Sequence, residues 1–294
     1  MKLTALMAAR NESWILGLSM RAALMYCDEV VVLNHASTDT TGGIIIDVAE
    51  GHPGRVCLLH EDSPTWNEMN HRQRMLDVAR SRRATHLAYI DADEVLTGNL
   101  LPFVRSQIAT LPNGGFLQVG MPCIWRGFDK WRDDTSVFGR ALTMLAFKDS
   151  GGLGWRPKAD GYQFHSREPH GARMAGRIAR ECGGQMHLQF ASWRRLIAKH
   201  ALYKMQETIR WPGRKTAKQI DDLYSMAPNE TGAILADTPG DWWEAYDHLL
   251  QYADLDQKPW QEDECKRLWK EYGPEVFKGL NLFGIVEQKE TVNA

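Results

Sequence analysis

The chain has 294 residues, of which 44% are hydrophobic and 24% are charged. These values are typical of globular proteins, and they exclude a disordered chain, a collagen-like repeat and a short disulfide scaffold. The net charge of −2 is unevenly spread, because residues 1–220 carry +8 and residues 221–294 carry −10. Two interpretations stay open: the acidic part packs on the basic body, or it faces water.

Five cysteines are widely spaced along the chain, and no CxxC pair occurs. Their odd number and their spacing predict free thiols in a reducing compartment. No apolar run approaches the roughly 18 residues that span a bilayer. Arg10 and Glu12 interrupt the apolar N-terminus too early for a signal peptide. We therefore expect a cytoplasmic protein, with peripheral contact to a membrane left open.

Strand-like and helix-like segments alternate over the first hundred residues. Short apolar runs predict strands at residues 3–8, 29–33, 55–60 and 86–90. Apolar residues at helical spacing predict a helix from Asn11 or Ser13 to residue 25, and further helices at residues 42–50 and 68–82. Such alternation is typical of a parallel α/β sheet.

The pattern changes beyond residue 110. Strands are predicted at residues 115–125, 141–148 and 186–190, and a helix is predicted at residues 192–209. Short helices joined by loops are expected after residue 214. In that part, the expected hydrophobic centre consists of Trp242, Trp243 and Tyr246.

Polar clusters follow three of the predicted strands, at Arg10–Glu12, Asn34–Asp39 and Asp91–Glu94. In open parallel sheets, ligands bind beyond the carboxyl ends of the strands. The three clusters therefore converge on one predicted crevice. Within the last of them, Asp91 and Asp93 are two carboxylates that can share a divalent cation with a diphosphate, and the metal would neutralise charge on a phosphate leaving group.

The order of five short motifs resembles family-2 glycosyltransferases of the GT-A fold. The motifs are Arg10-Asn11-Glu12, Asp28-Glu29, Ser37-Thr38-Asp39, Arg72-Gln73-Arg74 and Asp91-Ala92-Asp93-Glu94. The resemblance covers residues 1–95 well and residues 96–210 loosely, and it does not reach 215–294.

The resemblance implies a fold of the α/β class, with a GT-A-type mixed, mostly parallel sheet flanked by helices. The glycosyltransferase domain would span residues 1–214, with the nucleotide-sugar half at 1–110 and the acceptor half at 111–214. Residues 215–294 would form a small helical C-terminal extension.

The resemblance also implies a donor site for a nucleotide sugar. The donor-binding positions are Ala9, Arg10, Asn11, Glu12, Asn34, Ser37, Asp39, Arg72, Asp91, Ala92 and Asp93. A UDP-sugar is the first expectation, but the family usually has Asp where this chain has Asn34. An asparagine can donate as well as accept a hydrogen bond, which leaves the choice of base open. For Arg72 the alternative is an ordinary solvated helix arginine.

The implied cofactor is Mn²⁺ or Mg²⁺, held by Asp91, Asp93 and, in this chain, His187. The alternative for His187 is a hydrogen-bonded core histidine. An inverting transfer also needs a base to deprotonate the acceptor hydroxyl. The candidates are Asp160 first, then His165 and Glu168, and the family's usual His-Glu pair stands here as His165-Ser166.

Indole rings stack on the apolar faces of sugars. Trp125, Trp131 and Trp155 lie in the acceptor half and are candidates for acceptor contacts, with burial in the core as the alternative for each. Arg173, Arg177 and Arg180 have the spacing of one helix face. Arginines are expected near a diphosphate or an anionic acceptor.

The sequence thus predicts a metal-dependent, inverting glycosyltransferase that moves a sugar from a nucleotide-sugar donor to an acceptor hydroxyl on a glycan, a lipid-linked sugar or another molecule. The alternative is a carbohydrate- or nucleotide-binding module that has lost catalysis. A hydroxymethylated DNA base is a further acceptor idea, suggested by the basic body, although the pI of 6.6 argues against indiscriminate DNA binding. The oligomeric state stays open.

Overall fold

The computed structural model describes residues 1–156 and 167–286. Its strands are β1 (Leu3–Ala9), β2 (Glu29–His35), β3 (Val56–Glu61), β4 (His86–Tyr89), β5 (Glu94–Leu96), β6 (Gly115–Gly120), β7 (Lys130–Arg132), β8 (Leu142–Lys148), β9 (Arg173–Arg177), β10 (Gln185–His187) and β11 (Leu235–Asp237). Its α-helices are α1 (Leu16–Leu24), α2 (Thr41–Gly51), α3 (Glu68–Ser81), α4 (Leu101–Ala109), α5 (Trp193–Arg210), α6 (Ala217–Ser225), α7 (Gly240–Trp243) and α8 (Trp260–Tyr272). Short 3-10 helices connect several of these, the longest at Glu244–Tyr252.

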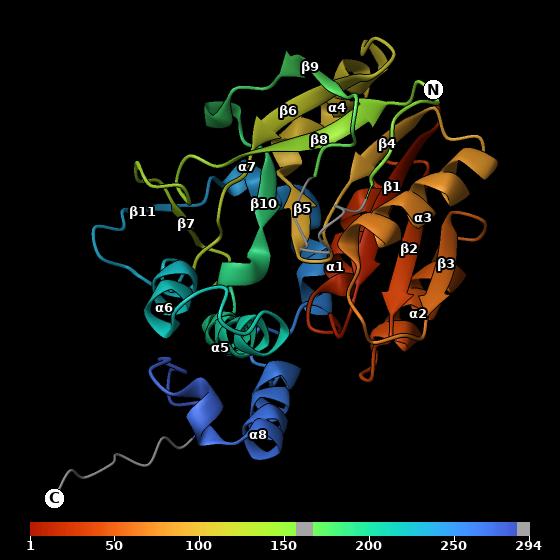
Figure 1. The fold of residues 1–294 in the computed structure, drawn as a ribbon. Helices are drawn as coiled ribbons and strands as arrows, with labels where there is room; N and C mark the ends of the chain where they lie inside the picture. Colours follow the sequence, from red (N-terminus) through yellow and green to blue (C-terminus); the bar gives the residue numbers. More distant parts are fainter. Residues whose placement is uncertain (157–166, 287–294) are drawn as a thin grey trace, which may run out of the picture.

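One seven-stranded sheet forms the centre of the molecule, in the order β3-β2-β1-β4-β8-β6-β9 (Figure 1). Strands β1 to β4 pair in parallel, β6 and β9 pair in parallel, and β8 runs antiparallel to both of its neighbours. This is the mixed, mostly parallel sheet of the GT-A type that the sequence predicts.

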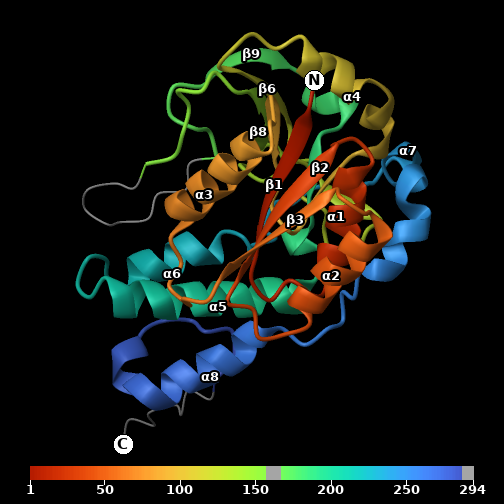
Figure 2. The same cartoon turned by 90° about the vertical axis from the view of Figure 1, so that its right-hand side faces the viewer.

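Both faces of the sheet are covered by helices, which explains why the central strands β1, β2 and β4 are mostly apolar and buried. Along β1, Ala5 and Met7 point into a core shared with α1, α2 and α4, whereas Leu6 points into a second core shared with α3. Figure 2 shows α1 and α2 on one side of the strands and α3 on the other. Successive side chains of a strand point to opposite faces of the sheet. Because both faces are covered here, every residue of a run such as Val30–Leu33 is buried and apolar.

A second, two-stranded sheet brings a distant segment to the end of β4. Strand β5 begins at Glu94, and β10 pairs antiparallel with it, so that His187 lies opposite Glu94. The observed strand covers residues 185–187, so only the first two residues of the predicted strand at 186–190 are extended, because Leu188–Phe190 turn into a 3-10 helix. That turn leads directly into α5.

Two further sequence expectations are corrected. Arg173 and Arg177 lie on the edge strand β9, not on a helix face, and Arg180 begins a short 3-10 turn. Helix α1 begins at Leu16, with no side-chain cap from Asn11 or Ser13. The helical spacing of the arginines is outweighed by the pairing of Arg173–Arg177 with β6.

The C-terminal part does not have the expected hydrophobic centre. Trp242, Trp243 and Tyr246 pack against Trp14 and Leu18 of the N-terminal body. The apolar cluster of the last helices is a different one, built from α5, α6 and α8 and the 3-10 turn at Pro274–Phe277. In addition, β11 pairs with β7. All five cysteines are free, and no helix among the described residues has both the length and the apolar character to cross a membrane.

Buried neutral histidines give the fold a predicted sensitivity to acid. His71 is buried between His35 and Trp66, and His200 is buried in α5. Burial lowers the pKa of both His71 and His200 to about 4. Because an unfolded histidine has a pKa near ~6.5, the unfolded state binds more protons between these values, and stability is lost as the pH falls below that point.

We expect each of these two histidines to contribute about 1–2 kcal/mol to the loss of unfolding free energy between pH 7 and pH 5. The measurement is urea unfolding across this pH range. His71→Gln and His200→Gln should each flatten the pH dependence, while the exposed His60→Gln should leave its slope unchanged. Unchanged slopes in both buried variants would contradict the assignment.

Candidate active site

The carboxyl ends of β1, β2 and β4 lie side by side at one edge of the sheet. Ala9 is the last residue of β1, is 1% exposed and pairs with Asn34 of β2. On the other side, β1 pairs in parallel with β4, so Asp91 follows at the same edge. The three polar clusters therefore converge as predicted. This edge is the candidate active site.

The turn after β1 is latched to the loop after β2. Asn11 Oδ1 accepts hydrogen bonds from the backbone N–H groups of Thr38 at 2.6 Å and Asp39 at 3.3 Å. In return, the Asn11 N–H donates to Ser37 Oγ at 3.1 Å, and Ser13 Oγ donates to Asp39 Oδ2 at 2.6 Å. Asn11 holds a left-handed backbone conformation with φ of 54°, which asparagine tolerates better than most residues. Asn11, Ser37 and Asp39 thus fix the two rims of the site relative to one another.

Asn34 differs from these residues because its Oδ1 atom is buried with no hydrogen-bond partner among the described residues. A buried acceptor without a partner is rare and points to a missing donor, such as a ligand N–H group. Arg10, by contrast, is engaged by the segment after β3 and by α8. It donates to the Pro64 carbonyl at 2.6 Å, and its guanidinium lies 5.5 Å from the ring centre of Trp260 in α8.

Asp91 is held by an arginine that the sequence analysis missed. Arg167 Nη1 lies 3.2 Å from Asp91 Oδ2 and 2.7 Å from Glu94 Oε1, and Arg167 Nη2 donates to the Tyr89 carbonyl at 2.9 Å. Glu94 is fully buried, and burial raises the pKa of its carboxyl despite the Arg167 charge. Arg167 lies in an irregular segment, so no periodicity could mark it. The guanidinium fixes Asp91 and Glu94 at the end of β4.

Asp93 faces a different pair of groups. It is 7% exposed, and its Oδ2 lies 3.7 Å from His187 Nε2 and 3.7 Å from Lys199 Nζ. Burial alone would raise the pKa of Asp93, but the charges of Lys199 and His187 outweigh it and hold that pKa below its usual range. Burial alone would likewise lower the pKa of His187, yet Asp93 raises it to about 10. The predicted pair Asp93 and His187 is brought together from β10 and the end of β4.

Glu12 completes the charged cluster from the β1 side. Its Oε2 accepts a hydrogen bond of 2.5 Å from Trp14 Nε1. Burial, and then the like charge of Asp93, raise the pKa of Glu12 to about 7. Arg195 lies over the Trp14 ring at 4.8 Å, is 4% exposed and is the third cation near these carboxylates. Ala92, between the two aspartates, is 4% exposed and packs into the core.

The residues at the end of β4 fit a divalent cation only in part. No three His, Cys, Asp or Glu side chains gather closely enough to bind a metal within residues 1–156 and 167–286. Asp91 is engaged with Arg167, which leaves Asp93 and His187 as the adjacent pair of oxygen and nitrogen donors. Mg²⁺ in phosphate-transfer enzymes is commonly held by one or two carboxylates together with substrate phosphate oxygens. The pair fits such a shared site.

Of the three candidates for the base, Asp160 and His165 lie outside the described residues. Glu168 is exposed and directly follows Arg167 in the chain. It is the one candidate among the described residues.

The three acceptor-side tryptophans have unequal exposure. Trp125 is fully buried, stacks on Phe190 and donates to Glu230 Oε1 at 2.7 Å. Trp155 is 2% exposed and packs against Tyr89. These two indoles are core residues with no face open to an acceptor, which corrects the expectation for them. Trp131 is half-buried against Trp242.

Arg72 is a buried residue, not a solvated helix arginine. It is 5% exposed, pairs with Glu68, and lies 4.2 Å from the ring centre of Tyr89. Its neighbour Gln73 accepts a hydrogen bond of 2.8 Å from the Trp155 backbone N–H. Helix α3 therefore anchors the segment that leads toward Arg167.

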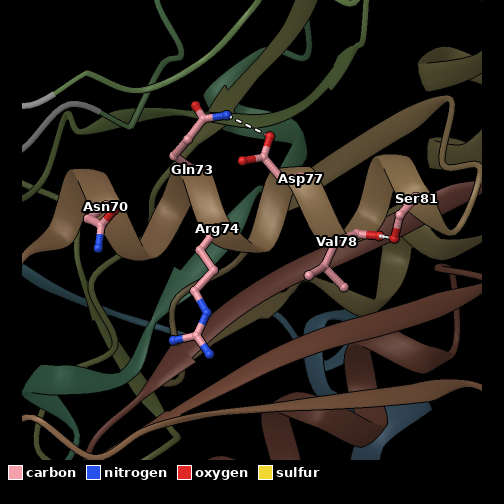
Figure 3. A pocket seen from close by; sticks show the side chains of 6 residues that line it. All are labelled: Asn70, Gln73, Arg74, Asp77, Val78 and Ser81. Carbon is pink, nitrogen blue, oxygen red and sulfur yellow. Dashed lines mark hydrogen bonds between the residues drawn. The ribbon is translucent and has the colours of Figure 1, made fainter.

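A shallow hollow lies along the outer face of α3, shown in Figure 3. Its lining residues are Asn70, Gln73, Arg74, Asp77, Val78 and Ser81. Gln73 and Asp77 hydrogen-bond to one another at 2.8 Å. None of the predicted site residues lines this hollow, so it is separate from the edge of the sheet described above.

No protein-family model matches the chain, and no curated protein matches it. Among solved structures, the chain is similar to S. aureus TarS 1-349, at 9% identity over 94% of this chain and 90% of that one, with a TM-score of 0.45. The complex of TarS 1-349 with UDP-GlcNAc gives 10% identity, the same coverage and a TM-score of 0.44. The alignment to its UDP complex spans 42% of this chain and 36% of that one.

Two other solved structures are similar in fold. The mannosyltransferase PcManGT from Pyrobaculum calidifontis, in complex with GDP-Man and Mn²⁺, aligns at 15% identity over 92% of this chain and 74% of that one, with a TM-score of 0.40. Glucosyl-3-phosphoglycerate synthase from Mycobacterium tuberculosis, with Mg²⁺ and UDP, aligns at 18% identity over 42% and 43%, with a TM-score of 0.30. These likenesses concern the fold alone. The architecture of a mixed, mostly parallel sheet flanked by helices follows from the strand order itself.

Proposed function

We propose that this chain is a metal-dependent, inverting glycosyltransferase that takes a sugar from a nucleotide-sugar donor to an acceptor hydroxyl. The observation that carries the proposal is the cluster at the sheet edge. There, Asp93 lies 3.7 Å from both His187 and Lys199, and the end of β2 at the same edge carries a buried acceptor atom of Asn34 that has no partner among the described residues. Fold alone does not fix function, so the proposal rests on this site.

Each part of the site has a role in this reaction. Asn34 Oδ1 accepts a hydrogen bond from an N–H group of the nucleotide base, and a UDP-sugar is the first donor to try. Asp93 and His187, the latter as a neutral imidazole, would hold Mn²⁺ or Mg²⁺, and the metal would supply a Lewis acid for the departing diphosphate. Arg167 keeps Asp91 and Glu94 in place. The hydrogen bonds of Asn11 hold the turn after β1 against the loop after β2. Holding the binding groups in position in this way accounts for much of a transferase's rate enhancement.

The acceptor side of the proposed reaction needs a base. A carboxylate or imidazole deprotonates the acceptor hydroxyl as it attacks the anomeric carbon. Glu168 is the described candidate, and Asp160 and His165 remain candidates outside the described residues. The acceptor is a saccharide or another hydroxyl-bearing molecule. The free cysteines are in keeping with a reducing, cytoplasmic location.

A thermal-shift panel tests this function. The panel consists of UDP, GDP, UDP-GlcNAc and GDP-Man, each with Mn²⁺ and each with excess EDTA. A ligand at about 100 times its dissociation constant adds ~2.7 kcal/mol to the stability of the native state. We expect one nucleotide family to raise the melting temperature in Mn²⁺, and this rise to be lost in Asp93→Ala. No shift with any nucleotide, with or without Mn²⁺, would overturn the proposal in favour of a module that binds no donor.

A further inference from the structure

One lysine at the donor edge has a geometry that a purely structural role does not explain. Helix α5 begins directly after the turn that follows His187, and Lys199 lies on its first two turns. Lys199 Nζ is 3.7 Å from Asp93 Oδ2, which is beyond hydrogen-bond distance. It donates one hydrogen bond, of 3.0 Å, to Gln189 Oε1. An ammonium group has three donors, so the described residues supply an acceptor for one of them.

Lys204, on the same helix, shows what a structural lysine looks like in this protein. Its side chain is 0% exposed, and its Nζ donates to Asp221 Oδ1, Ser225 Oγ and the Asn281 carbonyl at 2.8–2.9 Å. All three of its donors therefore have partners. Lys199 is 22% exposed and has one such partner. The difference indicates that Lys199 keeps donor capacity for a ligand at the open side of the cluster.

The neighbours of Lys199 identify the chemistry of that ligand. The ammonium stands beside Asp93, on the side of the site where the proposed donor places its diphosphate. A partly buried ammonium is stabilised by oxygen acceptors, and phosphate oxygens form strong charge-assisted hydrogen bonds with it. Lys199 reaches this position from α5, whereas the proposed metal ligands come from β10 and the end of β4. Lys199 therefore comes from a different element than the proposed metal ligands, although its Nζ stands 3.7 Å from one of them, Asp93 Oδ2.

We propose that Lys199 binds the diphosphate of the donor directly, as a fixed cation that acts beside the metal and retains part of the diphosphate affinity in its absence. This inference rests on the proposed function. In the transfer, the bond from the anomeric carbon to the diphosphate oxygen breaks, and its electron pair remains on that oxygen. The acceptor oxygen forms the new bond to carbon, and its proton passes to the base. Lys199 donates a hydrogen bond to the diphosphate that gains this charge, and it does not lose its own proton.

Such a role predicts a specific pattern of binding. A hydrogen bond from a charged donor changes affinity by about 10- to 100-fold. Lys199→Ala should therefore weaken the binding of the nucleoside diphosphate by at least 10-fold in excess EDTA, while the affinity for the matching nucleoside, which lacks phosphate, stays unchanged. In Mn²⁺, the same variant should lower kcat more than it raises KM, because the contact strengthens as charge develops on the leaving group.

The experiment is isothermal calorimetry on the full chain with the nucleoside diphosphate that shifts the melting temperature and with its nucleoside. Lys199→Arg should restore most of the affinity, because it keeps the charge. The matched control is Lys218→Ala on α6, a lysine that is 82% exposed and paired with Asp222. Melting temperatures of all variants report whether they fold.

The outcomes separate the two proposals. If the wild-type chain binds no nucleoside diphosphate in Mn²⁺ or in EDTA, the proposed function itself fails. If it binds in Mn²⁺ but not in EDTA, the metal-independent role of Lys199 is overturned while the function stands. If folded Lys199→Ala binds the diphosphate as the wild type does, or loses affinity equally for the nucleoside, the inference is overturned as well.

Discussion

Replacing Asp93 with asparagine is expected to lower kcat/KM for sugar transfer by about 10²- to 10³-fold, the size of effect seen when one electrostatic group is removed from an active site. Asparagine keeps the shape of the side chain and removes its charge. The carboxylate lies 3.7 Å from both His187 and Lys199, so its loss leaves two cationic partners without their counter-ion. It also replaces the carboxylate ligand of the proposed metal pair by a neutral amide, which binds a divalent cation more weakly. The measurement is donor turnover as a function of Mn²⁺ concentration.

Asp222→Asn is the matched control, because Asp222 is a carboxylate of α6 that is 64% exposed and pairs with Lys218. Its kcat/KM is expected to equal that of the wild type. Circular dichroism and the melting temperature separate a chemical effect from unfolding. A folded Asp93→Asn protein with full turnover would show that the donor site lies elsewhere.

Replacing Lys204 with methionine is expected to lower the free energy of unfolding by about 3–5 kcal/mol, the loss typical of removing one partner from a buried ion pair. Methionine matches the length of the lysine stem but leaves Asp221, Ser225 and the Asn281 carbonyl without their donor. These three acceptors come from α6 and from the segment after the last 3-10 turn. The measurement is guanidinium unfolding, followed by fluorescence and far-ultraviolet circular dichroism.

The control for this variant is Lys218→Met, which removes a lysine that is 82% exposed. Exposed ion pairs contribute little, so a change within about 1 kcal/mol is expected there. A loss in Lys204→Met no larger than that of the control would mean that Lys204 does not hold the C-terminal helices to α5.

The first half of the fold was predictable because its strands are buried on both faces. Runs such as Val30–Leu33 have no polar interruption, and the helices between them have a clear apolar stripe. Prediction failed where local periodicity is weak. The Arg173–Arg177 segment has helical charge spacing but pairs with β6 as an edge strand. The aromatic residues at Trp242 and Trp243 were correctly expected to be buried, but their partners on α1 lie more than 200 residues away in the chain.

The site shows the same division. Asp93 and His187 were found from motif order, and they lie 3.7 Å apart. Lys199 was visible only as one of several basic residues, although its spacing of four from Arg195 could have placed the two on one face of α5. No sequence pattern marked Arg167 as a site residue, because it lies outside any helix or strand. The burial of Trp125 and Trp155 depends on contacts with Phe190 and Tyr89 that only the folded chain reveals.

Helix α5 joins the donor edge to the C-terminal helices in one rigid segment. Figure 2 shows α8 lying along α5, and the apolar cluster between them includes Ala201, Leu202 and Met205. A chain cut at residue 214 would expose these apolar side chains to water. It would also remove the three hydrogen-bond acceptors of the Lys204 ammonium, which all follow residue 214. The C-terminal helices therefore stabilise α5 by packing against it. Removing them to obtain a smaller protein would remove the support of the helix that carries Lys199.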